Sequence, residues 1–172
     1  QRHAILQHIG CQEAFELIEL GAGDGLKTKV LLRHFVEQNV NFQYRPVDIS
    51  SSVLEQLSQS LATELPKLEV APLHGEYFQV LEELKDIGDH QKKVIFFLGA
   101  NIGNLTKPQS QQFLSQLNDL LAPGDMLLLG VDLKKDPATI LAAYNDPAGI
   151  TAAFNLNLLE RINNELGGQF EL

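Results

Sequence analysis

Three glycines within five positions constrain this chain more than any other feature of its sequence. Gly21, Gly23 and Gly25 directly follow residues 15–20, which are mostly apolar and predict a β-strand. Residues from Leu26 onward predict the first turns of a helix. Glycine tolerates positive φ and lets a ligand approach the backbone, while the helix start offers unpaired N–H donors and partial positive charge. A strand, a glycine turn and a helix in this order predict a nucleotide-binding corner of an open α/β fold.

Apolar patterns along the rest of the chain predict strands that alternate with helices. The predicted strands are 15–20, 42–47, 68–73, 94–98 and 126–131, and the predicted helices are 3–9, 26–38, 53–65, 76–85, 108–121, 137–144 and 147–166. Pro72 favours an edge position for the third strand. Ser50, Ser51 and Ser52 are candidate N-caps of the third predicted helix, and Ser52 with Glu55 has the spacing of a capping box. Gly88 is expected to close the helix before it. Right-handed crossovers between such elements predict an α/β fold with a doubly wound, mostly parallel sheet.

The predicted strand 126–131 is as apolar as a central strand, which suggests an unfinished sheet. At a free edge, its unpaired backbone would favour association with another chain. We therefore expect further strands to pair with it, from sequence outside these 172 residues or from a partner chain. We expect residues 1–172 to form a single domain that is truncated at both ends, with a homo-oligomer through the uncovered edge as the alternative.

The composition narrows the classes of partner. The formal net charge of −9 makes nucleic acid a poor partner, because an acidic domain repels phosphates. A single cysteine, Cys11, cannot form an internal disulfide, which favours a cytoplasmic setting. No apolar run reaches the roughly 18 residues that span a bilayer, so no membrane partner is expected.

The spacing of the glycines argues against a dinucleotide. The dinucleotide fingerprint G-x-G-x-x-G would need a glycine where this chain has Leu26, and no Walker pattern surrounds Lys27 and Thr28. Asp48 follows the second predicted strand, where a carboxylate can accept hydrogen bonds from both hydroxyls of a ribose. The alternative for Asp48 is an N-cap of the next helix. Together these features favour a nucleoside ligand without a pyrophosphate.

Several longer motifs resemble one family of methyltransferases. They are Glu19-Leu20-Gly21-Ala22-Gly23, Pro46-Val47-Asp48-Ile49-Ser50, residues 97–105, residues 123–130 and residues 132–155. In these motifs the chain resembles the S-adenosylmethionine-dependent histidine Nα-methyltransferases of the ergothioneine pathway and their relatives. The resemblance implies a Rossmann-like class I methyltransferase core with S-adenosyl-L-methionine as cofactor, and no metal.

The resemblance also implies which residues bind the cofactor. They are Gly21, Gly23, Lys27, Asp48, Glu76 and Tyr77. Asp48 is expected to bind the ribose, and Glu76 with Tyr77 the adenine, where the family has Asp and Phe. Alternatively, Lys27 is a solvent-exposed lysine in the first turn of its helix, and Glu76 is an acidic residue favoured at a helix start by the helix dipole.

For an amino-acid substrate, the resemblance implies contacts from Gly99, Asn104 and Tyr144. An asparagine amide can meet an ammonium or a carboxylate group. The alternatives are a loop-capping role for Asn104 and a half-buried helix aromatic for Tyr144. Phe154 and Leu158 are expected in the core.

The expected reaction is methylation of the amino group of a free amino acid, with histidine as the family's substrate. No side chain in the motifs is expected to act as a catalytic base, and His34 and His74 are expected to be surface or interface residues. In the family, the substrate pocket also uses an aromatic segment before Gln1 and a Glu-and-Ser pair beyond Leu172. The alternative is a non-catalytic module that binds S-adenosylmethionine or another protein.

Overall fold

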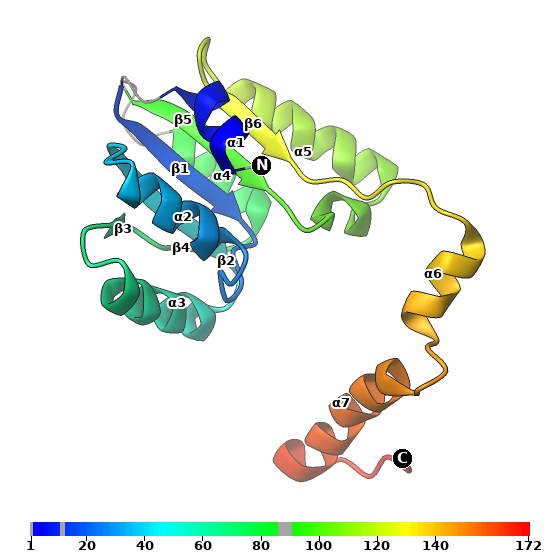
Figure 1. Ribbon diagram of the computed structural model, residues 1–172. Helices are drawn as coiled ribbons and strands as arrows, with labels where there is room; N and C mark the ends of the chain where they lie inside the picture. Colours follow the sequence, from blue (N-terminus) through cyan, green and yellow to red (C-terminus); the bar gives the residue numbers. More distant parts are fainter. Residues whose placement is uncertain (1, 11–12, 86–90) are drawn as a thin grey trace. The chain divides into compact units, whose positions relative to one another are not determined.

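The computed structural model describes residues 2–10, 13–85 and 91–172, which form two compact units. The first unit, Gln1–Val131, contains the sheet, and the second, Asp132–Leu172, contains two helices (Figure 1). The expectation of a single domain over residues 1–172 stays a prediction. The predictions made for Cys11 and Gly88 lie outside the described residues.

A parallel sheet forms the centre of the first unit (Figure 1). Its strands are β1 Phe15–Leu20, β2 Phe42–Asp48, β3 Glu69–Val70, β4 Leu73–His74, β5 Lys92–Phe97 and β6 Met126–Leu129. They lie in the order β3-β2-β1-β5-β6, β4 also pairs with β2, and every pairing is parallel. The predicted third strand is split at Pro72, which cannot donate a backbone hydrogen bond, and both pieces lie beside β2.

Helices cover both faces of this sheet, as a doubly wound fold requires. The helices are α1 Arg2–Ile9, α2 Thr28–Glu37, α3 Ser51–Glu64, α4 Tyr77–Lys85 and α5 Lys107–Leu120. Phe15 and Leu17 of β1 pack in one core cluster with α1, α2 and α3, whereas Ile18 and Leu20 pack in a second cluster with α4 and α5. The alternation follows from the period of two along a strand. The predicted α/β class is therefore confirmed.

Helix α3 begins earlier than its predicted capping box suggests. Ser50 is the N-cap, and its hydroxyl accepts a hydrogen bond from the Val53 N–H at 3.4 Å. The Ser52 hydroxyl instead lies 3.1 Å from the Ser50 hydroxyl. The prediction of a box between Ser52 and Glu55 is wrong, because the chain is already helical at Ser51.

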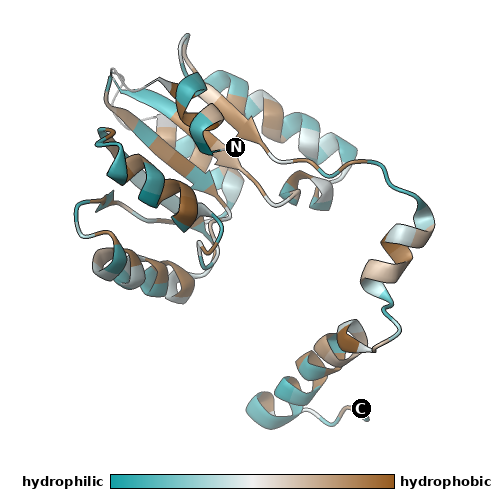
Figure 2. Ribbon diagram, in the orientation of Figure 1, coloured by the Kyte–Doolittle hydropathy of each residue, from teal (hydrophilic) through white to brown (hydrophobic). Residues whose placement is uncertain are grey.

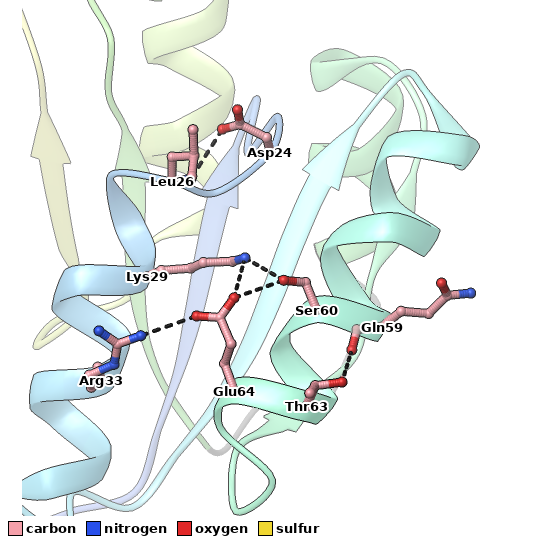
Figure 3. A network of polar contacts seen from close by, with 8 residues as sticks. All are labelled: Asp24, Leu26, Lys29, Arg33, Gln59, Ser60, Thr63 and Glu64. Atoms are coloured by element: carbon pink, nitrogen blue, oxygen red, sulfur yellow. Dashed lines mark hydrogen bonds and ion pairs between the residues drawn. The ribbon is translucent and has the colours of Figure 1, made fainter.

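A polar network joins the first turns of α2 to the last turn of α3 (Figure 3). Lys29 donates to the Ser60 hydroxyl at 2.5 Å and to the Glu64 carboxylate at 2.8 Å, and Arg33 donates to the same carboxylate at 3.1 Å. Ser60 also donates to Glu64, at 2.9 Å. It connects α2, which begins just after the glycine turn, to the end of α3 that lies farthest along the helix from Asp48.

Strand β6 is only partly buried in the first unit. It pairs with β5 alone among the described strands, and its four residues are apolar throughout (Figure 2). Its side chains are half-buried on both faces, and Val131, just beyond it, is exposed. In the first unit taken by itself, residues 126–131 are therefore not buried on both faces as predicted, because β5 is the one described strand beside β6.

The second unit consists of α6 Pro137–Tyr144 and α7 Ile150–Leu166. Helix α7 starts after Gly149 rather than at Pro147, and it ends at Gly167, where φ is +70°. In this unit taken by itself Phe154 and Leu158 are 76% and 61% exposed, and their place in a core stays a prediction. Among the described residues of either unit, no helix is both long and apolar enough to cross a membrane.

Candidate functional site

The glycine turn is anchored to the end of β2. The Gly21 and Ala22 N–H groups both donate to the Val47 carbonyl, at 2.8 and 3.0 Å. Gly21, Gly23 and Gly25 have φ values of +75°, +55° and +66°, a backbone region that residues with a Cβ atom rarely adopt. The sequence-based interpretation of this stretch as a tight turn between a strand and a helix is confirmed.

Asp48 fixes the turn from the neighbouring strand. Its Oδ2 accepts a hydrogen bond from the Gly23 N–H at 3.0 Å, and its Oδ1 accepts one from the Ser50 N–H at 3.0 Å. The N-cap of α3 is Ser50, so Asp48 is not that cap. Each carboxylate oxygen has a second lone pair, so the half-buried group can still accept hydrogen bonds from a ligand.

A pocket of about 290 Å³ opens beside the turn. Its lining residues are Gly21, Asp48, Ile49, Glu76, Tyr77 and Phe78. Four of the six predicted cofactor residues therefore share one pocket, at the carboxyl ends of β1 and β2, where open parallel sheets bind ligands. Ile49 and Phe78, which were not predicted as site residues, add apolar surface that could contact a base.

Tyr77 and Glu76 enter the pocket from the start of α4. The Tyr77 ring packs edge-on against Phe97, with ring centroids 5.3 Å apart. Burial, together with the nearby negative charge of Asp48, raises the pKa of Tyr77, so its hydroxyl stays protonated. Glu76 is exposed, and its backbone carbonyl accepts the Val80 N–H at 3.0 Å as the helix begins. This geometry leaves the Glu76 carboxylate at the rim of the pocket.

Lys27 lies apart from this pocket. It is exposed at the N-cap position of α2 and lines a larger hollow of about 510 Å³ together with Arg2, Thr28 and Leu98. Its role as a cofactor contact stays a prediction.

The predicted substrate residues fall in both units. Gly99 and Asn104 are exposed, and the 3₁₀-helix η1 Asn101–Asn104 follows the carboxyl end of β5. Gly99 and Ala100 both have positive φ, at +72° and +58°. Tyr144 is 75% exposed and belongs to the second unit. Substrate contacts from these three residues stay predictions.

A buried carboxyl beneath the turn was not predicted as a site residue. Glu19 is 4% exposed in β1, and its two oxygens accept hydrogen bonds from the Thr28 and Tyr44 hydroxyls, each at 2.5 Å. Burial raises the pKa of Glu19, and the two hydrogen bonds partly offset that rise. The signal in the sequence is an acid inside an apolar strand. Its partners, however, become visible only when β1, β2 and α2 lie side by side.

The two histidines considered as bases lie outside the pocket of the glycine turn. His74 is exposed, and its Nε2 lies 3.0 Å from the Ile49 carbonyl oxygen. His34 is buried where α1 meets α2, with its ring centroid 4.5 Å from that of His3. Among the described residues, no group of three or more His, Cys, Asp or Glu side chains could hold a metal ion.

A doubly wound parallel sheet, a glycine turn and an acid after the second strand together define a nucleoside-binding α/β protein of the Rossmann-like methyltransferase class. A solved structure of a mycolic acid cyclopropane synthase, in complex with S-adenosylhomocysteine, shares this fold at a TM-score of 0.53, with 16% identity over 95% of this chain and 51% of the other. The chain belongs to the family of histidine-specific, S-adenosylmethionine-dependent methyltransferases, whose family model matches residues 1–172.

Named relatives agree with this family. Histidine N-alpha-methyltransferase of Mycolicibacterium smegmatis is 38% identical, over 95% of this chain and 50% of its own length. Ergothioneine biosynthesis protein 1 of Neurospora crassa is 35% identical, over 88% of this chain and 17% of its own length. The chain thus spans half of the bacterial relative and a small part of the fungal one.

Proposed function

We propose that the protein transfers a methyl group from S-adenosylmethionine to the amino group of a free amino acid, histidine being the first candidate. The pocket that joins Gly21, Asp48, Glu76 and Tyr77 is the observation that carries this proposal. Membership of a family described as histidine-specific supports the substrate. The name of the Neurospora relative supports a place in ergothioneine biosynthesis.

The residues of the pocket suit a cofactor whose methyl group is already activated. Asp48 offers two acceptor oxygens for ribose hydroxyls, and Ile49 with Phe78 offers apolar surface for a purine. S-adenosylmethionine supplies a methyl group on a positively charged sulfur, so the protein's main tasks are alignment and exclusion of water. The substrate amine must be neutral to react, and desolvation favours its neutral form.

Calorimetry separates this function from other nucleotide-binding functions. We expect S-adenosylmethionine and S-adenosylhomocysteine to bind and NAD to show no heat of binding. Tight NAD binding without S-adenosylhomocysteine binding would overturn the proposal. Methyl transfer to a panel of free amino acids, measured on the full-length protein, then tests the substrate. Cofactor binding without transfer to any of them would favour a non-catalytic module.

Two substitutions test the division between cofactor and substrate residues. Asp48→Ala removes the ribose acceptor and should weaken S-adenosylhomocysteine binding about 10- to 100-fold, the usual effect of losing hydrogen bonds to a charged group. Asn104→Ala should leave that affinity unchanged and reduce turnover with amino acid. Equal loss of cofactor binding in both variants would contradict the division.

The remaining parts of the proposal concern setting and assembly. A small-molecule substrate, rather than nucleic acid, agrees with the net charge of −9. A cytoplasmic setting is supported by the single cysteine in 172 residues. A homo-oligomer that pairs strand β6 with a second chain is supported by the half-exposed apolar side chains of this strand.

A further inference from the structure

Two polar side chains face the first glycine of the turn from different elements. A Cβ placed on Gly21 would lie 2.5 Å from the Tyr77 hydroxyl oxygen and 3.1 Å from the Asn101 Nδ2. Tyr77 is the first residue of α4, and Asn101 is the first residue of η1, after β5. Both side chains therefore lie directly against the backbone of Gly21, over the carboxyl end of β1.

Asn101 also reaches the loop that carries the predicted substrate residues. A Cβ placed on Gly99 would lie 3.7 Å from Asn101 Oδ1. The Asn101 side chain thus lies close to both Gly21 of the glycine turn and Gly99 of its own loop after β5. Asn104 is the other asparagine of η1, and it is exposed.

The polar atoms of this pair are available to a ligand. Neither the Tyr77 hydroxyl nor the side-chain amide of Asn101 has a hydrogen-bond partner within the ranges 2–10, 13–85 and 91–172, although both residues are half-buried. Half-buried polar groups are usually paired with protein, water or ligand, because leaving one unpaired costs free energy. A hydroxyl and an amide each offer both donor and acceptor atoms.

Strand order indicates which part of a ligand would meet this pair. The strands run β2-β1-β5, so Asp48, Gly21 and Asn101 follow one another along the carboxyl edge of the sheet. A nucleoside whose ribose is held by Asp48, and which extends toward the loop after β5, must cross Gly21. The part that reaches Asn101 is then the chain attached to the ribose and not the base.

We propose that the Tyr77 hydroxyl and the Asn101 side-chain amide bind the amino-acid end of the cofactor as it passes over Gly21. This inference rests on the proposed function, because it takes an S-adenosyl compound as the ligand. Asn101 is then a cofactor-binding residue within the loop that also carries the predicted substrate contacts.

Two probes that differ only in the amino-acid end test this role. S-adenosylhomocysteine has that end, whereas 5′-methylthioadenosine keeps the adenine, the ribose and the thioether but lacks it. We expect Asn101→Ala to weaken S-adenosylhomocysteine binding about tenfold and to change methylthioadenosine binding less than about twofold. Tyr77→Phe should act in the same direction with a loss of about threefold. Isothermal titration measures all of these affinities.

Asn104→Ala is the matched control, because it removes the same side chain from the same 3₁₀-helix. It should bind both probes like the unsubstituted protein. The inference is overturned if Asn101→Ala binds S-adenosylhomocysteine normally, or if it loses both probes equally, since the residue would then only shape the turn. If the unsubstituted protein binds neither probe, the proposed function itself fails.

Discussion

At the scale of single residues, Glu19 joins three pieces of the cofactor corner. Its carboxyl group lies in β1, and its two hydrogen bonds reach the first residue of α2 and the middle of β2. Each of the three side chains is at most 5% exposed. Because the pKa of Glu19 is raised, the folded chain holds this proton more tightly than the unfolded chain does.

Stability should therefore depend on pH through Glu19. As pH rises from the usual carboxyl pKa of 4.5 through the raised one, the free energy of unfolding loses the contribution of this proton. Glu19→Gln cannot titrate, so the stability of this variant relative to the unsubstituted protein should increase over that pH interval. Urea unfolding at several pH values between 4 and 8 measures the difference.

Two further variants sharpen this measurement. Thr28→Val and Tyr44→Phe keep the carboxyl group but each remove one donor that favours its charged form. In both variants the pKa of Glu19 should rise further, and the loss of stability with pH should become larger. Parallel pH profiles for Glu19→Gln and the unsubstituted protein would show that the carboxyl group does not titrate as described.

Residue predictions succeeded where the signal is local in sequence. The glycine turn was predicted correctly, because a strand followed by closely spaced glycines is visible within a short stretch of sequence. The role of Asp48 in binding a ribose stays a prediction. Asn101 was not predicted as a cofactor residue, because its place beside Gly21 depends on β5 lying next to β1. The partners of Glu19 could not be predicted either, because they also depend on which strands and helices lie side by side.

At the scale of elements, the polar network links the first turns of α2 to the last turn of α3. Lys29 and Ser60 donate to Glu64, and these hydrogen bonds lower the pKa of its carboxyl group. A lowered pKa stabilises the folded state above the usual carboxyl pKa, and this contribution disappears as pH falls through the lowered one. Because the group is solvent-accessible, salt should also screen its ion pairs.

Glu64→Gln should lower the melting temperature slightly at neutral pH and low salt, by about 1–3 °C, as for other surface pairs. The difference should shrink in 0.5 M salt and at pH 3, where the carboxylate is screened or protonated. Glu55→Gln, on the same helix, is the matched control and should change little. A difference that persists in high salt would show that packing, and not charge, links the helices.

Element boundaries shifted wherever backbone conformation decides them. Helix α2 begins at Thr28 rather than Leu26, since Gly25 still has positive φ and is followed by a turn. The third strand was predicted over residues 68–73 with an interruption at Pro72, and the structure divides it there into β3 and β4. Apolar periodicity predicts which face of a helix or strand is buried. It does not predict where the first helical hydrogen bond forms, and this bond decides where the helix begins.

At the scale of the whole molecule, strand β6 forms an edge of the described sheet and is the place where we expect a second chain to pair. Met126 and its neighbours are half-buried, and β6 has one described neighbour in the sheet. The fold class could be predicted from the alternation of strands and helices. The burial of β6 could not, because an apolar stretch has the same sequence pattern whether the residues that bury it belong to the same chain or to another.

Met126→Lys should therefore reduce self-association, because a charged side chain on an edge strand opposes pairing with a second strand. Sedimentation velocity over a range of concentrations should show a shift toward the monomer. Val131→Lys, which lies beyond the strand at an exposed position, is the control and should leave the distribution unchanged. Identical profiles for Met126→Lys and the unsubstituted protein would exclude this edge as an interface.

The register of β1 has a consequence for the order of folding. Phe15 pairs with Phe42 on one side and with Lys92 on the other, so β1 has one near and one distant partner along the chain. Closing the longer loop costs more entropy, and distant pairings slow folding. The half of the corner made by Gly21 and Asp48 can form within the first 50 residues, whereas the half that carries Asn101 must wait for β5. We expect Gly21 and Asp48 to come together first and Asn101 to join them last as the chain folds.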